Sequence, residues 1–254
     1  MATDFYVWRR PLDFAPPLDH TWVTTYQPVA TCPPDASLGD YWYCWGVCHE
    51  TGPGTNGELL HYGVGDLERA HCLDTPNDSD SHAGIPGFYG EYGVCHQVAN
   101  RMLFATEGPL TIKGANGWFL SYLVYGWYGG PEGNWEERKH QCGLAQKAEM
   151  TERDLDEELL EEALGKGFQP AKLQELAEIK DRIRVARDQL ARQVHSGQLT
   201  VEEYARAVNE LLTDTLPDLA KLVGAHKAKA VFGVEPGEDV VLLDPNIAQD
   251  EDKK

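Results

Sequence analysis

The residues best suited to chemistry lie in the stretch 92–103, YGVCHQVANRML. Cys95 follows a glycine and precedes residues that can continue as a helix, so we expect it in a first helical turn. A helix N-terminus lowers the pKa of a cysteine, because free N–H groups and aligned peptide dipoles favour the thiolate. Three roles are open to Cys95: a nucleophile, a metal ligand, or a small buried thiol that packs in the core.

A catalytic thiol also needs a base within hydrogen-bond reach and a donor for the oxyanion. His20 opens a predicted strand, and a rigid element would hold its ring in place. His140 lies in a charged segment and is the less favoured base. The N–H of Cys95, with Gln97 or Tyr92 as a nearby donor, could stabilise the oxyanion. The residues therefore favour Cys95 as nucleophile and His20 as base.

The order of these features resembles the circularly permuted papain-like cysteine enzymes, which include the lecithin retinol acyltransferase-like group. In both, a histidine on a strand is followed by further strands and then by Gly-x-Cys at a helix start. The resemblance is one of pattern and covers roughly residues 18–125. It implies a cysteine peptidase, amidase or acyltransferase that acts on an amide or ester bond. It also implies an orienting residue on the strand after the base, where the candidate is His49.

Histidine and cysteine are also neighbours at Cys48-His49 and at Cys95-His96. Sulfur and imidazole are ligands that zinc and iron accept. The chain has no Cys-x-x-Cys pair, and adjacent residues on a strand point to opposite faces. We therefore favour no metal and no cofactor, and keep these four residues as the alternative set for zinc or iron.

Aromatic residues are concentrated in the first 145 residues, which hold all seven tryptophans. The clusters at 88–92 and 122–130 could line a pocket for an apolar substrate, although packing within strands is the commoner use. The candidate substrate-binding residues are Tyr92, Trp45, Trp118 and Tyr125.

Residues 1–147 predict an α+β domain with a mainly antiparallel sheet and one cysteine-bearing helix at about 95–106. Short runs of β-branched and aromatic residues between turn signals mark the strands. Asn116-Gly117 is a strong hairpin signal, so we expect strands on both sides of it. The predicted strands cover residues 20–26, 40–47, 58–64, 111–113 and 118–127.

From residue 148 the apolar residues recur with a helical period. We expect a helical hairpin domain over residues 148–230, with Thr200 and Glu203 as a capping box between its long helices. Residues 231–254 read as an irregular tail. This part has no catalytic constellation, so its expected role is a docking surface, a lid or an oligomerisation hairpin. A non-catalytic module that binds a protein partner through these helices is the third functional hypothesis.

Composition narrows the functional classes further. The 254 residues carry a formal charge of -19, which would repel nucleic acid. No apolar run is long enough to predict a membrane span. The N-terminal residues do not read as a secretory signal, so we expect a cytoplasmic protein with all six cysteines as free thiols. The expected partner is a small-molecule or peptide substrate.

Overall fold

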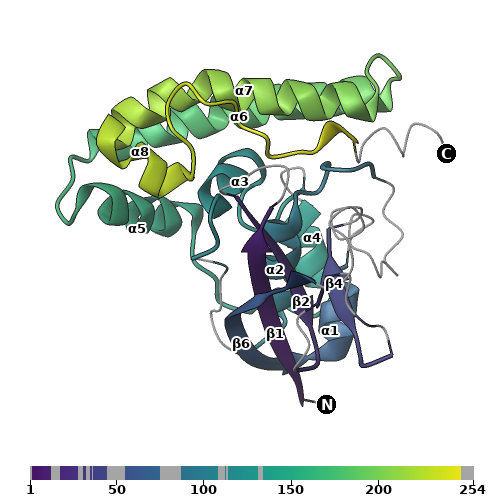
Figure 1. Cartoon of the computed structure of the whole chain (residues 1–254). Helices are drawn as coiled ribbons and strands as arrows, with labels where there is room; N and C mark the ends of the chain where they lie inside the picture. Colours follow the sequence, from purple (N-terminus) through teal and green to yellow (C-terminus); the bar gives the residue numbers. More distant parts are fainter. Residues whose placement is uncertain are drawn as a thin grey trace.

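The computed structural model is an α+β fold with a four-stranded antiparallel sheet, as the sequence predicted (Figure 1). It describes residues 2–12, 18–27, 31–32, 35, 37–44, 55–74, 87–107, 112, 114–130 and 134–246. The strands are β1 (Ala2–Pro11), β2 (Asp19–Thr24), β3 (Thr31–Cys32), β4 (Tyr41–Tyr43), β5 (Thr55–Asn56) and β6 (Glu58–Asp66). The helices are α1 (Leu67–Cys72), α2 (Cys95–Phe104), α3 (Trp118–Tyr125), α4 (Asn134–Gln141), α5 (Glu152–Leu164), α6 (Ala171–His195), α7 (Val201–Val223) and α8 (Ala225–Phe232).

The main sheet has the strand order β4-β2-β1-β6, and β3 and β5 form a separate two-stranded ladder. Strand β1, which the sequence reasoning missed, pairs with both β2 and β6 and so lies inside the sheet. Alternation places its residues on two faces. Val7, opposite Val23, belongs to the main hydrophobic core, whereas Trp8, opposite Trp22, belongs to an aromatic cluster with Tyr43. Both faces of β1 therefore carry buried apolar residues. Its sequence for this reason lacks the alternation of apolar and polar residues that marks a half-exposed strand.

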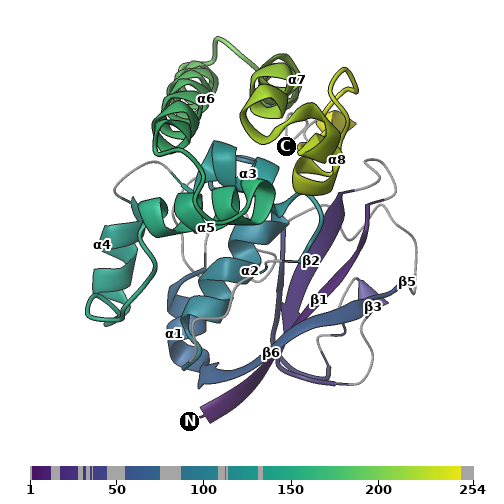
Figure 2. The ribbon, with the colours of Figure 1, turned by 90° about the vertical axis from the view of Figure 1, so that its left-hand side faces the viewer.

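Helix α2 packs against β2 and is covered on its other side by further helices (Figure 2). All ten of its residues are buried, including four polar ones. A helix in this position has no solvent face, so each polar side chain on it must find a partner within the protein.

The strand and hairpin predicted around Asn116-Gly117 are wrong, because residues 118–125 form helix α3. Gly117 has φ = 77° and stands at the N-cap of this helix, so the Asn-Gly pair turns the chain into a helix instead of a strand. Seven of the eight residues of α3 are buried. A short apolar run that is buried on all sides carries no clear period, and here tertiary packing decides for the helix.

The long helices α6 and α7 lie side by side as a helical pair. Thr200 caps α7: its hydroxyl accepts from the N–H of Glu203, and its own N–H donates to the Glu203 carboxylate. The buried apolar residues of these helices form one continuous hydrophobic cluster with those of α2, α3 and the sheet. The helical part therefore shares its core with the first 147 residues.

Two further findings concern the cysteines and the length of the apolar helices. Cys72 and Cys142 form a disulfide that joins α1 to the end of α4, so the expectation that all cysteines are free thiols is wrong. The two residues come together only through tertiary packing. Among the described residues, no helix is both long and apolar enough to cross a lipid bilayer.

The disulfide should contribute strongly to stability, because it closes a loop of 70 residues in the unfolded chain. A loop of this length corresponds to about 4 kcal/mol in the chain-entropy account. We expect the double variant Cys72→Ser, Cys142→Ser to lose roughly this free energy of unfolding, measured by denaturant titration. A reductant should lower the stability of the parent protein to that of the variant and leave the variant unchanged. Equal stabilities without reductant would contradict the bond's structural role.

Candidate functional site

Cys95 is the first residue of α2, and its side chain is 6% exposed. Its Sγ lies 3.9 Å from the carbonyl oxygen of Asp19 on β2, where the thiol donates. Thr21 of β2 also lies near the sulfur. The thiol is thus held against the start of β2, and the residue between its two contacts there is His20.

The chain approaches Cys95 through a backbone that demands glycine. Gly93 has φ = 110°, and a Cβ at this position would lie 2.6 Å from the side chain of Gln97. Gln97 reaches back, and its Oε1 accepts from the N–H of Val94 at 3.0 Å. Its Nε2 donates to Ser121 Oγ at 3.3 Å and to the carbonyl of Gly126 at 3.0 Å. Gln97 therefore caps the helix, and its amide is not available as the predicted oxyanion donor.

His96 is a buried histidine with both ring nitrogens engaged. Nε2 lies 3.0 Å from the carbonyl oxygen of Asp19, and Nδ1 lies 2.9 Å from Ser121 Oγ. A carbonyl only accepts, so Nε2 carries a proton. The Ser121 hydroxyl, which has a single hydrogen, lies within hydrogen-bond distance of both Nδ1 and the carbonyl of Trp118. Burial lowers the pKa of His96 to about 4, which keeps the ring neutral. His96 and Cys95 both hydrogen-bond to the carbonyl of Asp19, and these two bonds hold the start of α2 against β2.

His20 is fully buried, and its ring stacks on that of Trp22 with 5.5 Å between centroids. Burial, with the nearby charge of Arg10, lowers its pKa well below the ordinary value. The backbone of His20 borders the Cys95 thiol, while its ring is turned toward the aromatic cluster. The structure thus brings Cys95 next to the start of β2, but the His20 ring lies on the other face of the sheet, with Trp22. His140 is exposed on α4. It takes no part in the contacts between the start of α2 and β2.

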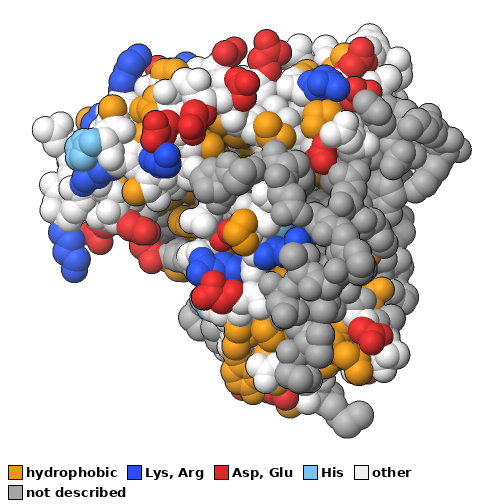
Figure 3. All heavy atoms as spheres, in the orientation of Figure 1, with side chains coloured by type: hydrophobic (Ala, Val, Ile, Leu, Met, Phe, Trp, Pro, Cys, Tyr) orange, Lys and Arg blue, Asp and Glu red, His pale blue; other side chains and the backbone are white. Residues whose placement is uncertain are grey.

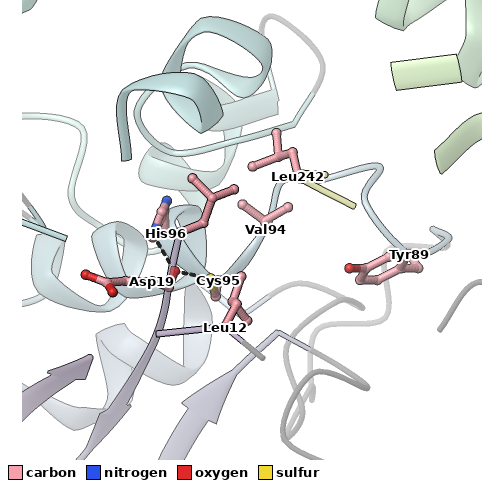
Figure 4. A pocket seen from close by; sticks show the side chains of 8 residues that line it. Leu12, Asp19, Tyr89, Val94, Cys95, His96 and Leu242 are labelled. Atoms are coloured by element: carbon pink, nitrogen blue, oxygen red, sulfur yellow. Dashed lines mark hydrogen bonds between the residues drawn. The ribbon is translucent and has the colours of Figure 1, made fainter. Parts of the chain in front are cut away.

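A small cavity lies beside Cys95, with free space of about one water molecule (Figure 4). Leucine side chains and Val94 make most of its wall, and Tyr89, Asp19 and His96 add polar atoms. Tyr89 belongs to the aromatic cluster at 88–92 that the sequence suggested for a pocket. The residues around the cavity are Leu12, Leu18, Asp19, Tyr89, Val94, Cys95, His96 and Leu242.

The predicted substrate-binding residues that the structure describes do not line this cavity. Trp118 packs edge to face against Trp127, and Tyr125 is buried beneath Arg187. Tyr92 is buried, and its carbonyl accepts from Arg101. These aromatic residues belong to the packing of the core. Trp45 lies outside the described residues.

Two of the four residues in the alternative metal set, Cys48 and His49, lie outside the described residues, so the set as a whole stays a prediction. In the part of the chain that the structure describes, no group of three or more His, Cys, Asp or Glu side chains could hold a metal ion. The third triad member that His49 was to supply also stays a prediction.

Two polar residues of α2 had no role in the sequence reasoning. Asn100 donates to the carbonyl of Trp127 at 2.9 Å, and Arg101 donates to the carbonyls of Tyr92 and Tyr128. With Gln97 they tie the loop after α3 to the buried helix. The repeat of polar residues inside an otherwise apolar helix was the signal that could have identified them as hydrogen-bonding anchors.

Burial dominates the electrostatics of the thiol. It raises the pKa of Cys95 to about 11, although hydrogen bonds from Thr21 favour the thiolate and offset part of the effect. The same burial raises the pKa of Tyr89, whose hydroxyl faces both Cys44 and Cys95. In this closed arrangement Cys95 is therefore a neutral thiol, and the helix N-terminus does not outweigh its loss of water.

A second, more open hollow lies between α5 and α6. Its buried charges already have partners. Lys180 Nζ lies 2.5 Å from Asp156 and 3.3 Å from Glu152, and it donates to the Tyr122 hydroxyl. Arg184 also binds Glu152 with two hydrogen bonds of 2.8 Å. We assign this cluster to the packing of α5 and α6 against α3.

The chain matches no protein-family model, no curated protein and no solved structure. The function therefore has to be argued from the residues and their arrangement.

The buried, neutral state of His96 predicts a pH dependence of stability. Its pKa is about 4 in the folded protein and 6.5 ordinarily, so between these values only the unfolded chain takes up the proton. Its contribution to stability is complete above about pH 6.5 and falls by about 3 kcal/mol as the pH drops to 4. Denaturant titrations of the parent and of His96→Gln should measure this as a pH-dependent difference. A difference that is constant from pH 7 to pH 4 would contradict the assignment.

Proposed function

We propose that the chain is a thiol hydrolase or acyl-transfer enzyme that attacks an amide or ester carbonyl through Cys95. The observation that carries the proposal is the meeting of the α2 N-terminus with the start of β2. This contact places Cys95 on the wall of a cavity, directly beside the backbone of His20. The pattern resemblance to permuted papain-like enzymes points in the same direction. The arrangement described above is then a closed state of the enzyme.

The two nearby imidazoles take different roles in this proposal. Both ring nitrogens of His96 lie at hydrogen-bond distance from other groups, Asp19 and Ser121, so its role is to position the helix. His20 is the base. Its ring lies with Trp22 on the opposite face of the sheet from the core that holds Cys95, so it reaches the sulfur only if the start of β2 rearranges when the site opens. The N–H of Cys95 lies in the first turn of α2, where backbone donors have no helical partner, and it is the oxyanion donor.

The reaction proceeds in two balanced steps. The thiol proton passes to His20, and the sulfur attacks the carbonyl carbon, while the leaving amine or alcohol takes the proton from His20. The resulting thioester is cleaved by water in hydrolysis or by another nucleophile in transfer, which restores the thiol. Substrate entry requires the cavity to open, since its present space admits about one water molecule.

Replacement of the nucleophile should separate chemistry from folding. We expect Cys95→Ala to abolish hydrolysis of a p-nitrophenyl ester and acylation of the protein. The assay is run in buffer and in urea below the unfolding transition, because local opening admits the substrate. Cys44→Ala is the matched control, since Cys44 is also a buried cysteine. Turnover that survives in Cys95→Ala would refute the proposal.

Replacement of each histidine should separate the base from the positioning residue. His20→Gln should lower kcat by at least 100-fold with little change in KM, in line with the loss of a general base. His96→Gln should mainly lower the unfolding free energy and leave measurable turnover in the folded fraction. The reverse result would transfer the role of base to His96.

A second candidate, a non-catalytic protein-binding module, is favoured by the burial of the thiol itself. In that case the α6–α7 pair would supply the contact surface, and Figure 3 shows acidic and basic side chains interspersed over this region. An inert Cys95 under conditions that open the cavity, together with a folded protein, would favour this candidate over the enzyme.

A further inference from the structure

The C-terminal part of the chain returns to the candidate site after α8. Residues 240–244, here called the strap, pass beneath α7 on the side that faces the rest of the molecule (Figure 1). The strap forms neither a helix nor a ladder with a strand, yet its residues are largely buried. Val240 is 1% exposed, Leu243 is 0% and Asp244 is 3%. Irregular chain that is buried this deeply must be held by side chains of other elements.

Asn209 of α7 is the principal anchor of the strap. Its Oδ1 accepts from the N–H of Leu242 at 2.9 Å and from that of Leu243 at 3.0 Å, and its Nδ2 donates to the carbonyl of Leu243 at 2.7 Å. The N–H of Val240 donates to Thr213 Oγ1 at 2.9 Å. These bonds come from two side chains on one helix. The strap can therefore detach from α7 without breaking hydrogen bonds between the strands of the sheet.

The strap closes one side of the Cys95 cavity. Leu242 forms part of the cavity wall together with Val94 and Leu12 (Figure 4). Leu243 packs against Gly90 so closely that a Cβ on this glycine would lie 2.9 Å from its side chain. The N–H of Asp244 donates to the hydroxyl of Tyr89 at 3.3 Å, and Tyr89 lines the same cavity. The strap thus contacts both the wall and the loop that leads into Cys95.

The segment before the strap is exposed. Residues 235–239, with the sequence EPGED, are exposed between buried Val234 and buried Val240. Exposed turns of small and polar residues are preferred sites of cleavage and of tolerated insertion. A cut here separates the strap from α8, so that among the described residues its packing and the hydrogen bonds to Asn209, Thr213 and Tyr89 retain it.

We propose that the strap is a displaceable lid that keeps Cys95 inaccessible, and that its release opens the site. A biological role for this lid rests on the proposed thiol chemistry. Whether the strap blocks access to Cys95 does not depend on that chemistry. Release removes Leu242 from the cavity wall and admits water and reagents to the sulfur. With water present, the cause of the raised thiol pKa is also removed, since that cause is burial.

The test uses the full chain with a specific protease site inserted into residues 235–239. Cys95 alkylation by iodoacetamide at neutral pH is followed by mass spectrometry before and after the cut. We expect the rate to rise at least tenfold after the cut, while the circular dichroism spectrum is retained. A synthetic peptide of residues 239–246 should restore the slow rate. Unchanged alkylation after loss of the strap, shown by mass, would overturn the proposal.

A second variant decides the matter if the cut protein fails to fold. Leu242→Ala keeps the strap attached but opens the cavity wall, so Cys95 alkylation should rise at least tenfold. Leu222→Ala is the matched control, because it removes the same atoms from a buried leucine of α7 that does not line the cavity. Equal alkylation rates in the two variants would show that general loosening, and not the strap, governs access.

The outcomes distinguish the lid from the enzyme. If alkylation accelerates but the opened protein does not hydrolyse or bind the p-nitrophenyl ester, the lid stands and the proposed function fails. If ester turnover depends on Cys95 and is the same before and after the cut, the proposed function stands and the lid fails.

Discussion

The structure depends on the complete burial of α2. A helix without a solvent face must satisfy each polar group within the protein, because an unpaired polar group in the core costs about 1–3 kcal/mol. Here the carbonyl of Asp19 accepts from both Cys95 and His96, Gln97 caps the first turn, and Arg101 reaches two further carbonyls. These bonds fix where α2 begins, how it meets β2 and where the loop after α3 runs.

The helical hairpin is part of this arrangement. His195, at the end of α6, lies 2.7 Å from Glu91, and the Tyr204 hydroxyl donates to the carbonyl of Gly90 at 3.2 Å. Both contacts hold the loop that leads into Cys95. At the other end, the buried Lys180–Asp156 pair joins α6 to α5. Loss of one member of such a pair is costly, because the remaining charge stays buried. The hairpin therefore supports the loop before the thiol as well as the strap that covers it.

Packing and the proposed thiol chemistry place opposite demands on Cys95. The burial that stabilises the protein also protonates the thiol, so stability and reactivity oppose each other at Cys95. The proposed chemistry needs a movable part, and the strap is held by few hydrogen bonds compared with the sheet or the helices. The disulfide between Cys72 and Cys142 lies on α1 and α4, away from this part, and strengthens the frame without tethering the strap. Disulfides persist in oxidising compartments, so a cytoplasmic location stays a prediction.

The sequence by itself determined the α+β class, the antiparallel sheet, and the use of Thr200 as a helix cap. Periodicity and capping act over a few residues, so neighbours along the chain carry that information. Tertiary structure decided that β1 lies inside the sheet, that residues 118–125 are helical, and that Cys72 pairs with Cys142. It also decided the state of the site: Gln97 and His96 are engaged, the ring of His20 faces Trp22, and Leu242 closes the cavity. Burial and partner choice depend on residues as far apart as Asp19, Cys95 and Leu242, and no local pattern specifies which distant side chains will meet.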